Sequence, residues 1–421
     1  NEALMDGLRT VSDLPRGRPD PDAFSFFTIE NARHVVVRKL TFTNCLPTAI
    51  RIKNSQHVAI ERCVFSRASY AIAAGTHGEV DETQYLLIDN CRSIQDPDQN
   101  LWRGRVSWHS VKQQALKQED ARHYNGSFFK CFCIRGDVMI RRTNVAHTFN
   151  GVNFWNKEDT LDRHHNIFIT GCRFAFIRDN AIEPEWRVDN LWVVNNSFYN
   201  CHNPFSMDHV EGHHRYYFGN TILNRVRPGA LTDANRGGKI FKFTPSEYPP
   251  TPIGEFYTAY NAVLTRTAYL KGGRTQHWTH ANNAISVQRD GPHTSPHTPL
   301  APADFLIDAT FNIGGDITDT APLAAESQFT NSFRRINAPL FEPPVLRADF
   351  AGTTDEWDGQ LTLAGVARHE RTVAVNVALA DGSTVTVPRG EHYGAGTPTT
   401  LMDAFKAQSS YFWKTPPPAL G

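Results

Sequence analysis

The chain has 421 residues, and its 43 Lys and Arg residues balance its 43 Asp and Glu residues, so the formal net charge is zero. A balanced charge gives no overall attraction to nucleic acid or to an anionic membrane surface, and no apolar run approaches the about 20 residues that cross a bilayer. The seven cysteines are an odd number, which argues against a disulfide framework. Composition therefore predicts neither nucleic-acid nor membrane partners.

Residues 1–24 are polar and contain proline, which predicts an arm or a cap ahead of the first repeat. The opening residues Asn1 to Met5 lack the pattern of a signal peptide, so either such a peptide was removed or the chain never had one.

One register recurs through residues 25–286. A hydrophobic residue is followed three places later by a small, thiol or amide residue, as in Ile60-Glu-Arg-Cys63 and Val193-Val-Asn-Asn196. Most of these later positions follow one another at steps of 22 to 29 residues, which is typical of a solenoid whose repeats stack. They form one column: Leu40, Cys63, Cys91, Thr143, Cys172, Asn196, Asn220, Asn261 and Asn283.

The repeats consist of strands. Short runs of Val, Ile, Phe and Thr alternate with Asn, Gly and Asp, and no apolar stripe of helical period is sustained in the repeats. Three short strands and three turns fit the period, because strands of about 3 to 6 residues are common. Stacked coils lie about 4.8 Å apart, so an inward Asn would bond the Asn above and below, and a thiol fits the same slot.

This repeat pattern resembles the pectate-lyase-like superfamily of proteins. The resemblance implies an all-β fold, a right-handed parallel β-helix, here with about nine coils and a C-terminal appendage. It covers the repeat pattern and no catalytic motif. The superfamily contains lyases, hydrolases, epimerases and non-catalytic proteins, so the resemblance predicts the fold more strongly than the activity.

Three segments break the period. Residues 95–130 are predicted to be an insertion, because the step from Cys91 to Thr143 is 52 residues. Residues 287–303 are rich in Pro, His and Thr and are predicted to be a linker. In the C-terminal region 304–421, residues 371–387 predict one β-hairpin that turns at Asp381-Gly382; the region either covers the last coil or forms a small β module.

The strand ahead of each column segment predicts an exposed face that carries chemistry. Side chains alternate along a strand, so the second and fourth positions point inward and the third and fifth point outward. One outward column is then Arg51, Ala73, Asn153, Glu183, Ser206 and Lys242, and the other is Lys53, Gly75, Trp155, Glu185, Asp208 and Thr244. Glu185 stacked on Asp208 costs stability unless a cation or a proton compensates.

Three functions fit this cluster. In a polysaccharide lyase, Glu183, Glu185 and Asp208 hold Ca²⁺ or act as acid and base groups, and Lys242 removes the C5 proton of a uronate. In a glycoside hydrolase, two of the carboxylates act as acid and as base or nucleophile. In the third reading the cluster is a solvated face of a non-catalytic glycan-binding or structural protein. We expect β-elimination of an acidic polysaccharide, by a secreted or periplasmic enzyme without an organic cofactor.

The expected substrate contacts are aromatic, polar and basic. Trp155 offers a face on which a sugar ring packs, and Asn153 lies beside it. Arg187, Arg51 and Lys53 would bind the acidic chain. The sequence does not reveal the sugar, the linkage or the oligomeric state.

Overall fold

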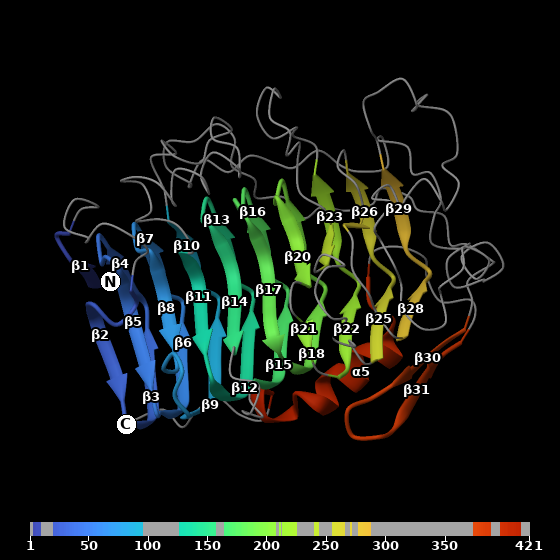
Figure 1. The fold of residues 1–421 in the computed structure, drawn as a ribbon, viewed down its shortest axis with the longest axis horizontal. Helices are drawn as coiled ribbons and strands as arrows, with labels where there is room; N and C mark the ends of the chain where they lie inside the picture. The colour runs from blue at the N-terminus through green and yellow to red at the C-terminus, as the bar shows by residue number, and fades with distance from the viewer. Residues whose placement is uncertain are drawn as a thin grey trace.

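The computed structural model describes residues 3–9, 20–95, 126–156, 164–207, 210–211, 213–224, 240–243, 255–265, 270–271, 277–287, 374–388 and 396–413. In these residues the chain winds as a right-handed parallel β-helix, which confirms the predicted fold class. Three parallel sheets, here called A, B and C, run along the molecule (Figure 1).

The strands of each sheet follow one another coil by coil. Sheet A contains β1 (Ala3–Asp6), β4 (Leu40–Thr43), β7 (Val64–Ser66), β10 (Arg92–Ile94), β13 (Asn144–Ala146), β16 (Arg173–Ala175), β19 (Ser197–Tyr199), β23 (Thr221–Asn224), β26 (Ala262–Thr265) and β29 (Ala284–Val287). Sheet B contains β2 (Ser25–Glu30), β5 (Thr48–Lys53), β8 (Tyr70–Ala74), β11 (Ser127–Phe132), β14 (Asn150–Asn156), β17 (Asn180–Arg187), β20 (Asn203–Met207), β24 (Phe241–Phe243) and β27 (Leu270–Lys271), with β21 (Val210–Glu211) paired to β17. Sheet C contains β3 (Arg33–Arg38), β6 (Gln56–Glu61), β9 (Asp81–Asp89), β12 (Ile134–Arg141), β15 (His165–Thr170), β18 (Asp189–Val194), β22 (Arg215–Phe218), β25 (Glu255–Ala259) and β28 (His277–Ala281).

Each coil gives one strand to sheet B, then one to sheet C, then one to sheet A, and the described residues contain nine such coils. β1 pairs in parallel with β4, so the N-terminal segment adds a strand of sheet A ahead of the first coil. β11 begins at Ser127, inside the range that the sequence assigned to an insertion, and residues 96–125 lie outside the described residues.

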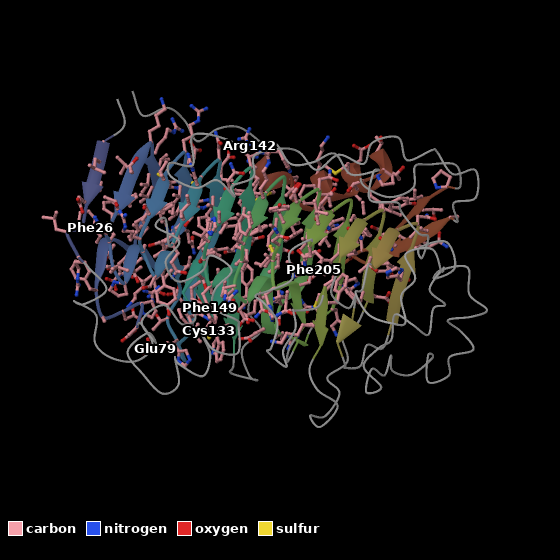
Figure 2. All side chains as sticks on the ribbon, turned by 90° about the horizontal axis from the view of Figure 1, so that it is seen from above. Phe26, Glu79, Cys133, Arg142, Phe149 and Phe205 are labelled. Atoms are coloured by element: carbon pink, nitrogen blue, oxygen red, sulfur yellow. The ribbon has the colours of Figure 1, made fainter. Side chains whose placement is uncertain are left out.

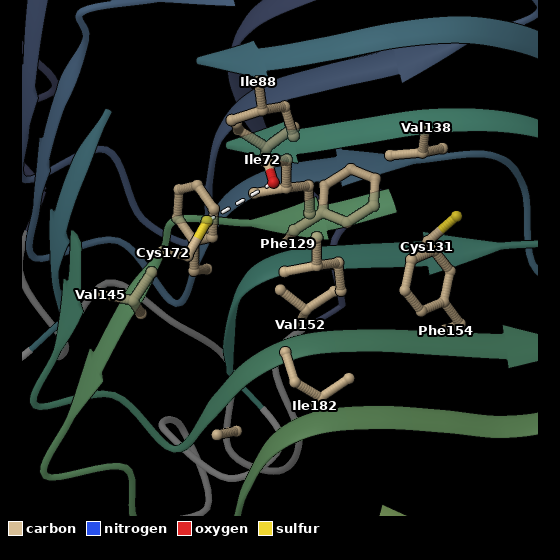
Figure 3. Close-up of a cluster of buried hydrophobic side chains, with 14 of the residues drawn as sticks. Ile72, Ile88, Phe129, Cys131, Val138, Val145, Val152, Phe154, Cys172 and Ile182 are labelled. Carbon is tan, nitrogen blue, oxygen red and sulfur yellow. Dashed lines mark hydrogen bonds between the residues drawn. The ribbon is translucent and has the colours of Figure 1, made fainter. Parts of the chain in front are cut away.

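The interior is an apolar core that continues from coil to coil. Ile72, Phe129, Val152 and Ile182 occupy equivalent inward positions of sheet B and stack on one another (Figure 3). All seven cysteines are buried free thiols. Cys172, for example, donates its S–H to the carbonyl of Ile140 one coil away, at 3.5 Å.

The predicted amide ladder lies in the bend between sheets C and A. Asn196 donates through Nδ2 to Asn220 Oδ1 at 3.2 Å, Asn220 donates to Asn261 at 3.0 Å, and Asn261 donates to Asn283 at 2.9 Å. Each Oδ1 also accepts the backbone N–H of the preceding member, for example from Asn220 to Asn261 at 2.9 Å. Because these groups are buried, the ladder supplies the hydrogen bonds that water would otherwise provide.

The C-terminal region supplies a hairpin and a helix. β30 (Val375–Ala378) and β31 (Thr384–Val387) are antiparallel, as predicted, and α5 (Thr399–Gln408) and the short η5 (Ser410–Phe412) follow. These elements lie along the outer face of sheet C (red in Figure 1), where the Phe405 ring packs 5.8 Å from Trp192. The sequence left the position of this region open.

Residues 288–373, which include the predicted linker, lie outside the described residues. Among the described helices, none combines the length and apolarity that a membrane span requires.

Candidate functional site

The candidate site is the outward face of sheet B. Strand β17 shows why the sequence creates it: Ile182 points into the core, and the next residue, Glu183, therefore points away from it. Neighbouring strands follow the predicted register, since Arg51 pairs with Ala73, Asn153 with Glu183, and Ser206 with Lys242. Residues that are far apart in the sequence thus form one outward column.

Lys130 is a further member of this column. It pairs with Ala73 on one side and with Asn153 on the other, so it lies between two residues that the sequence had placed on successive coils. The insertion after Ile94 hid this strand, because the predicted insertion extended through residue 130. One signal in the sequence identifies this strand. Ser127-Phe-Phe-Lys-Cys-Phe132 has the same alternation of inward and outward residues as the neighbouring strands.

Lys130, Asn153 and Glu183 form a hydrogen-bonded chain, here called the relay. The Lys130 ammonium donates to Asn153 Oδ1, and Asn153 Nδ2 donates to Glu183 Oε2. An ammonium group only donates hydrogen bonds, so Lys130 fixes which end of the Asn153 amide faces Glu183. The three side chains are 4 %, 1 % and 4 % exposed, although they point away from the core.

A second amide holds the other oxygen of Glu183. Asn180 Nδ2 donates to Glu183 Oε1 at 2.5 Å. Asn203 Nδ2 in turn donates to Asn180 Oδ1 at 3.0 Å, which orients the Asn180 amide. Both carboxyl oxygens of Glu183 therefore have a fixed amide partner, and its position is set by two neighbouring coils.

Burial raises the pKa of Glu183 well above its usual value, and the negative charges of Glu185 and Asp179 raise it further. The positive charges of Lys130 and Lys242 act in the opposite direction and are weaker. A carboxyl group of this kind retains its proton under conditions in which an exposed Glu has lost it. A buried, protonated acid beside a second carboxylate is a common arrangement in catalytic sites.

The second outward column brings Trp155 and Glu185 together. Trp155 pairs with Glu185 across β14 and β17, and both side chains are half-buried. The Lys130 ammonium lies 5.0 Å from the centre of the Trp155 ring, so the indole also contacts the relay. Both side chains are more accessible than that of Glu183.

The structure describes two further predicted site residues, Lys242 and Arg187. Lys242 is half-buried on β24. Arg187 is about 40 % exposed and its guanidinium lies 3.3 Å from the Asp189 carboxylate. Asp208 and Thr244 lie outside the described residues, so the predicted stacking of Glu185 on Asp208 stays a prediction.

Arg51 and Lys53 bind within the protein. The Arg51 guanidinium is buried, pairs with Asp22 at 2.9 Å and donates to the carbonyl of Ala73 at 3.1 Å and to that of Gly75. The Lys53 ammonium also pairs with Asp22, at 2.6 Å. These contacts hold the N-terminal segment against the first coils.

Three carboxylates of this face were also predicted to bind Ca²⁺: Glu183, Glu185 and Asp208. In the part of the chain that the structure describes, no three His, Cys, Asp or Glu side chains form a group that would hold a metal ion. Glu183, one of the predicted ligands, already accepts hydrogen bonds on both oxygens. Ca²⁺ binding by Glu183, Glu185 and Asp208 stays a prediction.

Comparison with known protein families and with curated proteins gives no match for this chain.

Proposed function

We propose that this protein is an enzyme of the pectate-lyase-like type that cleaves an acidic, uronate-containing polysaccharide by β-elimination at the outward face of sheet B. The observation that carries the proposal is the buried relay that ends on Glu183, a carboxyl group with a raised pKa beside a second carboxylate. Burying such groups costs stability, and proteins keep them mainly where they serve function.

The charges of the column favour an acidic substrate. Glu183 lies between two lysines: Lys130 two coils before it and Lys242 two coils after it along sheet B. Two coils correspond to about 10 Å. An acidic chain held along the sheet would therefore run past two basic residues, and the fixed positive charge of Lys130 lowers the cost of the negative charge that develops as the C5 proton leaves.

Elimination needs one base and one acid. Lys242 first releases its own proton to solvent and then takes the C5 proton, as the C5–H electron pair becomes the C4–C5 double bond. The bond from C4 to the glycosidic oxygen breaks at the same time, and the departing oxygen takes a proton from the Glu183 and Glu185 pair. Lys242 ends protonated and the pair ends with one proton fewer, so exchange with water restores both groups.

The relay keeps the acid ready. Repulsion between Glu183 and Glu185 means that the pair holds one proton more firmly than either group would alone. The positive charge of Lys130 lowers the pKa of Glu183, so it helps Glu183 to release the proton in the reaction step. Trp155, paired with Glu185, offers the aromatic face on which a sugar ring packs.

No step above uses a metal ion. Ca²⁺ takes 6 to 8 oxygen ligands, and Glu183 accepts one hydrogen bond on each oxygen, which leaves a lone pair on each. The predicted ligand set of Glu183, Glu185 and Asp208 therefore stays a prediction.

A glycoside hydrolase is the second candidate. Glu183 and Glu185 lie two residues apart on one strand, so their backbones are separated by about 6.6 Å, and one member of the pair retains a proton. Hydrolysis would use the same pair without Lys242. The secreted or periplasmic location that we predict fits either substrate class.

A screen of uronate-containing polymers tests the proposal. Polygalacturonate, alginate and hyaluronan are incubated with the full chain, and both ultraviolet absorbance and new reducing ends are measured. A lyase produces an unsaturated product that absorbs, and a hydrolase produces reducing ends without that absorbance. Binding without either signal would support a glycan-binding protein and would contradict both enzymatic proposals.

Lys242→Ala distinguishes the proposed lyase from the proposed hydrolase. We expect elimination to fall at least a hundredfold, since a positioned base contributes about 10²- to 10⁴-fold. Lys406→Ala, which removes an exposed lysine from α5, is the matched control and should keep full activity. If Lys242→Ala keeps its activity while folding normally, Lys242 is not the base.

A further inference from the structure

A groove lies on a different part of the solenoid from the candidate site. It has a volume of about 630 Å³ and runs between the first coils of sheet C and the end of the C-terminal region. Leu87 and Asp89 of β9 line it on one side, and Phe412 and Trp413 line it on the other. Arg142 also lines the groove. It lies on the opposite side of the solenoid from Cys133, which is in the bend between sheets B and C (Figure 2).

The groove is strongly basic. Its lining contains five cationic side chains and two carboxylates, which gives a formal charge of +3: the cations are Arg38, Lys39, Arg62, Arg141 and Arg142, and the carboxylates are Glu61 and Asp89. Both carboxylates are already paired, Glu61 with Arg38 at 2.7 Å and Asp89 with Arg141 at 3.0 Å and with Arg142. Lys39 and Arg62 have no ion-pair partner among the described residues.

The cations are arranged in a row. Lys39, Arg62 and Arg142 occupy the same left-handed turn position of their coils, with φ values of 56°, 52° and 52°. Lys39 and Arg62 belong to successive coils, about 4.8 Å apart. Arg142 follows two coils later, because Asn90 holds that position in the coil between them. A row of this kind suits a repeating anion better than a single one.

One wall of the groove is aromatic. Trp413 is 44 % exposed, and the Arg141 guanidinium lies 4.9 Å from its ring centre, which holds the indole in place. An exposed indole above a row of cations offers both a surface for the apolar face of a sugar ring and partners for its acidic groups.

We propose that this groove binds a segment of an acidic saccharide chain, as a second binding site separate from the face of sheet B. The choice of a saccharide over other polyanions rests on the proposed function, whereas the polyanion site itself rests only on the charges and the aromatic wall. The site would retain the polymer on the enzyme while sheet B acts on another part of it.

Calorimetric titration of the full chain tests the site, with oligogalacturonate and heparin hexasaccharides as acidic probes, maltohexaose as the neutral probe and inorganic sulfate as the simple anion. The groove variant is the double substitution Lys39→Ala and Arg62→Ala. The control is Arg33→Ala with Lys406→Ala, which removes the same charge from exposed positions outside the groove.

We expect an acidic hexasaccharide to bind the wild type with a salt-dependent affinity, and maltohexaose and sulfate to bind at least tenfold more weakly. The groove variant should lose one equivalent of binding or at least tenfold in affinity, since it removes two charge-assisted contacts to the acidic groups of the probe. Trp413→Ala should weaken binding about threefold to tenfold, and the control should stay within twofold.

The outcomes also separate this site from the proposed activity. If the wild type binds two equivalents and the groove variant binds one, both sites exist. If the wild type binds one equivalent and the groove variant binds none, the groove is the binding site and binding at sheet B is not supported. Unchanged binding in the groove variant, equal binding of maltohexaose, or no binding of either acidic probe at millimolar concentration would overturn the proposal.

Discussion

The outward faces of sheets B and C are built by the same coils and have opposite chemistry. Outward positions of sheet C carry Phe168, Trp192 and Tyr216, and the C-terminal elements cover them in a second apolar core. Equivalent positions of sheet B carry Lys130, Asn153 and Glu183, which are equally buried but bonded to one another. Burial of apolar side chains on sheet C stabilises the fold, whereas burial of the polar relay on sheet B costs stability. This difference is why we assign the function to sheet B.

Trp192→Ala tests the apolar side of this comparison and has the largest expected effect on stability. The Trp192 side chain is fully buried against Tyr216 and Phe405, so truncation should cost about 3–5 kcal/mol of unfolding free energy. Denaturant unfolding measures the loss. Activity per folded molecule should stay within twofold, and a large loss of activity without a loss of stability would contradict a purely structural role for this face.

Lys130→Met tests the polar side and should have a smaller effect. We expect kcat to fall about tenfold to a hundredfold, because the relay then lacks its donor. Lys130 lowers the pKa of Glu183, so its removal raises that pKa, and the alkaline limb of kcat/KM should move to higher pH. Lys130→Arg, which keeps the charge, should keep the limb near its wild-type position. If the alkaline limb of kcat/KM stays at its wild-type pH in Lys130→Met, Lys130 does not influence the pKa of Glu183.

The sequence was sufficient to predict the register of sheet B, because inward residues such as Val152 and Ile182 come nine or ten residues after the preceding repeat position, here Thr143 and Cys172. It did not reveal Lys130, since the residues after Ile94 interrupt the period and the next strand has no repeat position close before it. Nor did it reveal that the outward column is buried, because alternation along a strand says which face a side chain takes and not what covers that face.

The position of the C-terminal region depends on contacts between distant parts of the sequence. Phe168-Ile169 and Trp192-Val193 place an apolar residue on each face of sheet C, which is typical of a strand covered on both sides. That signal predicts that something packs on the outer face. It does not specify Phe405 or the hairpin as the partner, since such pairing is set by shape and not by a local pattern.

Glu183→Gln shows whether Glu183 is the buried acid of the site, when activity and thermal unfolding are measured on the same samples. A group whose pKa is raised in the folded state keeps its proton there while the unfolded chain releases it, so above pH 4.5 Glu183 lowers the stability of the fold. Gln cannot ionise, so it removes this pH-dependent loss of stability, but its Nε2 faces one of the two fixed amide donors and lowers stability to the same extent at every pH. The Tm of the variant relative to that of the wild type should therefore rise between pH 4 and pH 7, and activity should fall at least a hundredfold. Glu79→Gln, an exposed control, should change neither quantity. A Glu183→Gln variant that keeps its activity, or whose Tm relative to the wild type is the same at pH 4 and at pH 7, would show that Glu183 is not a buried acid with a raised pKa.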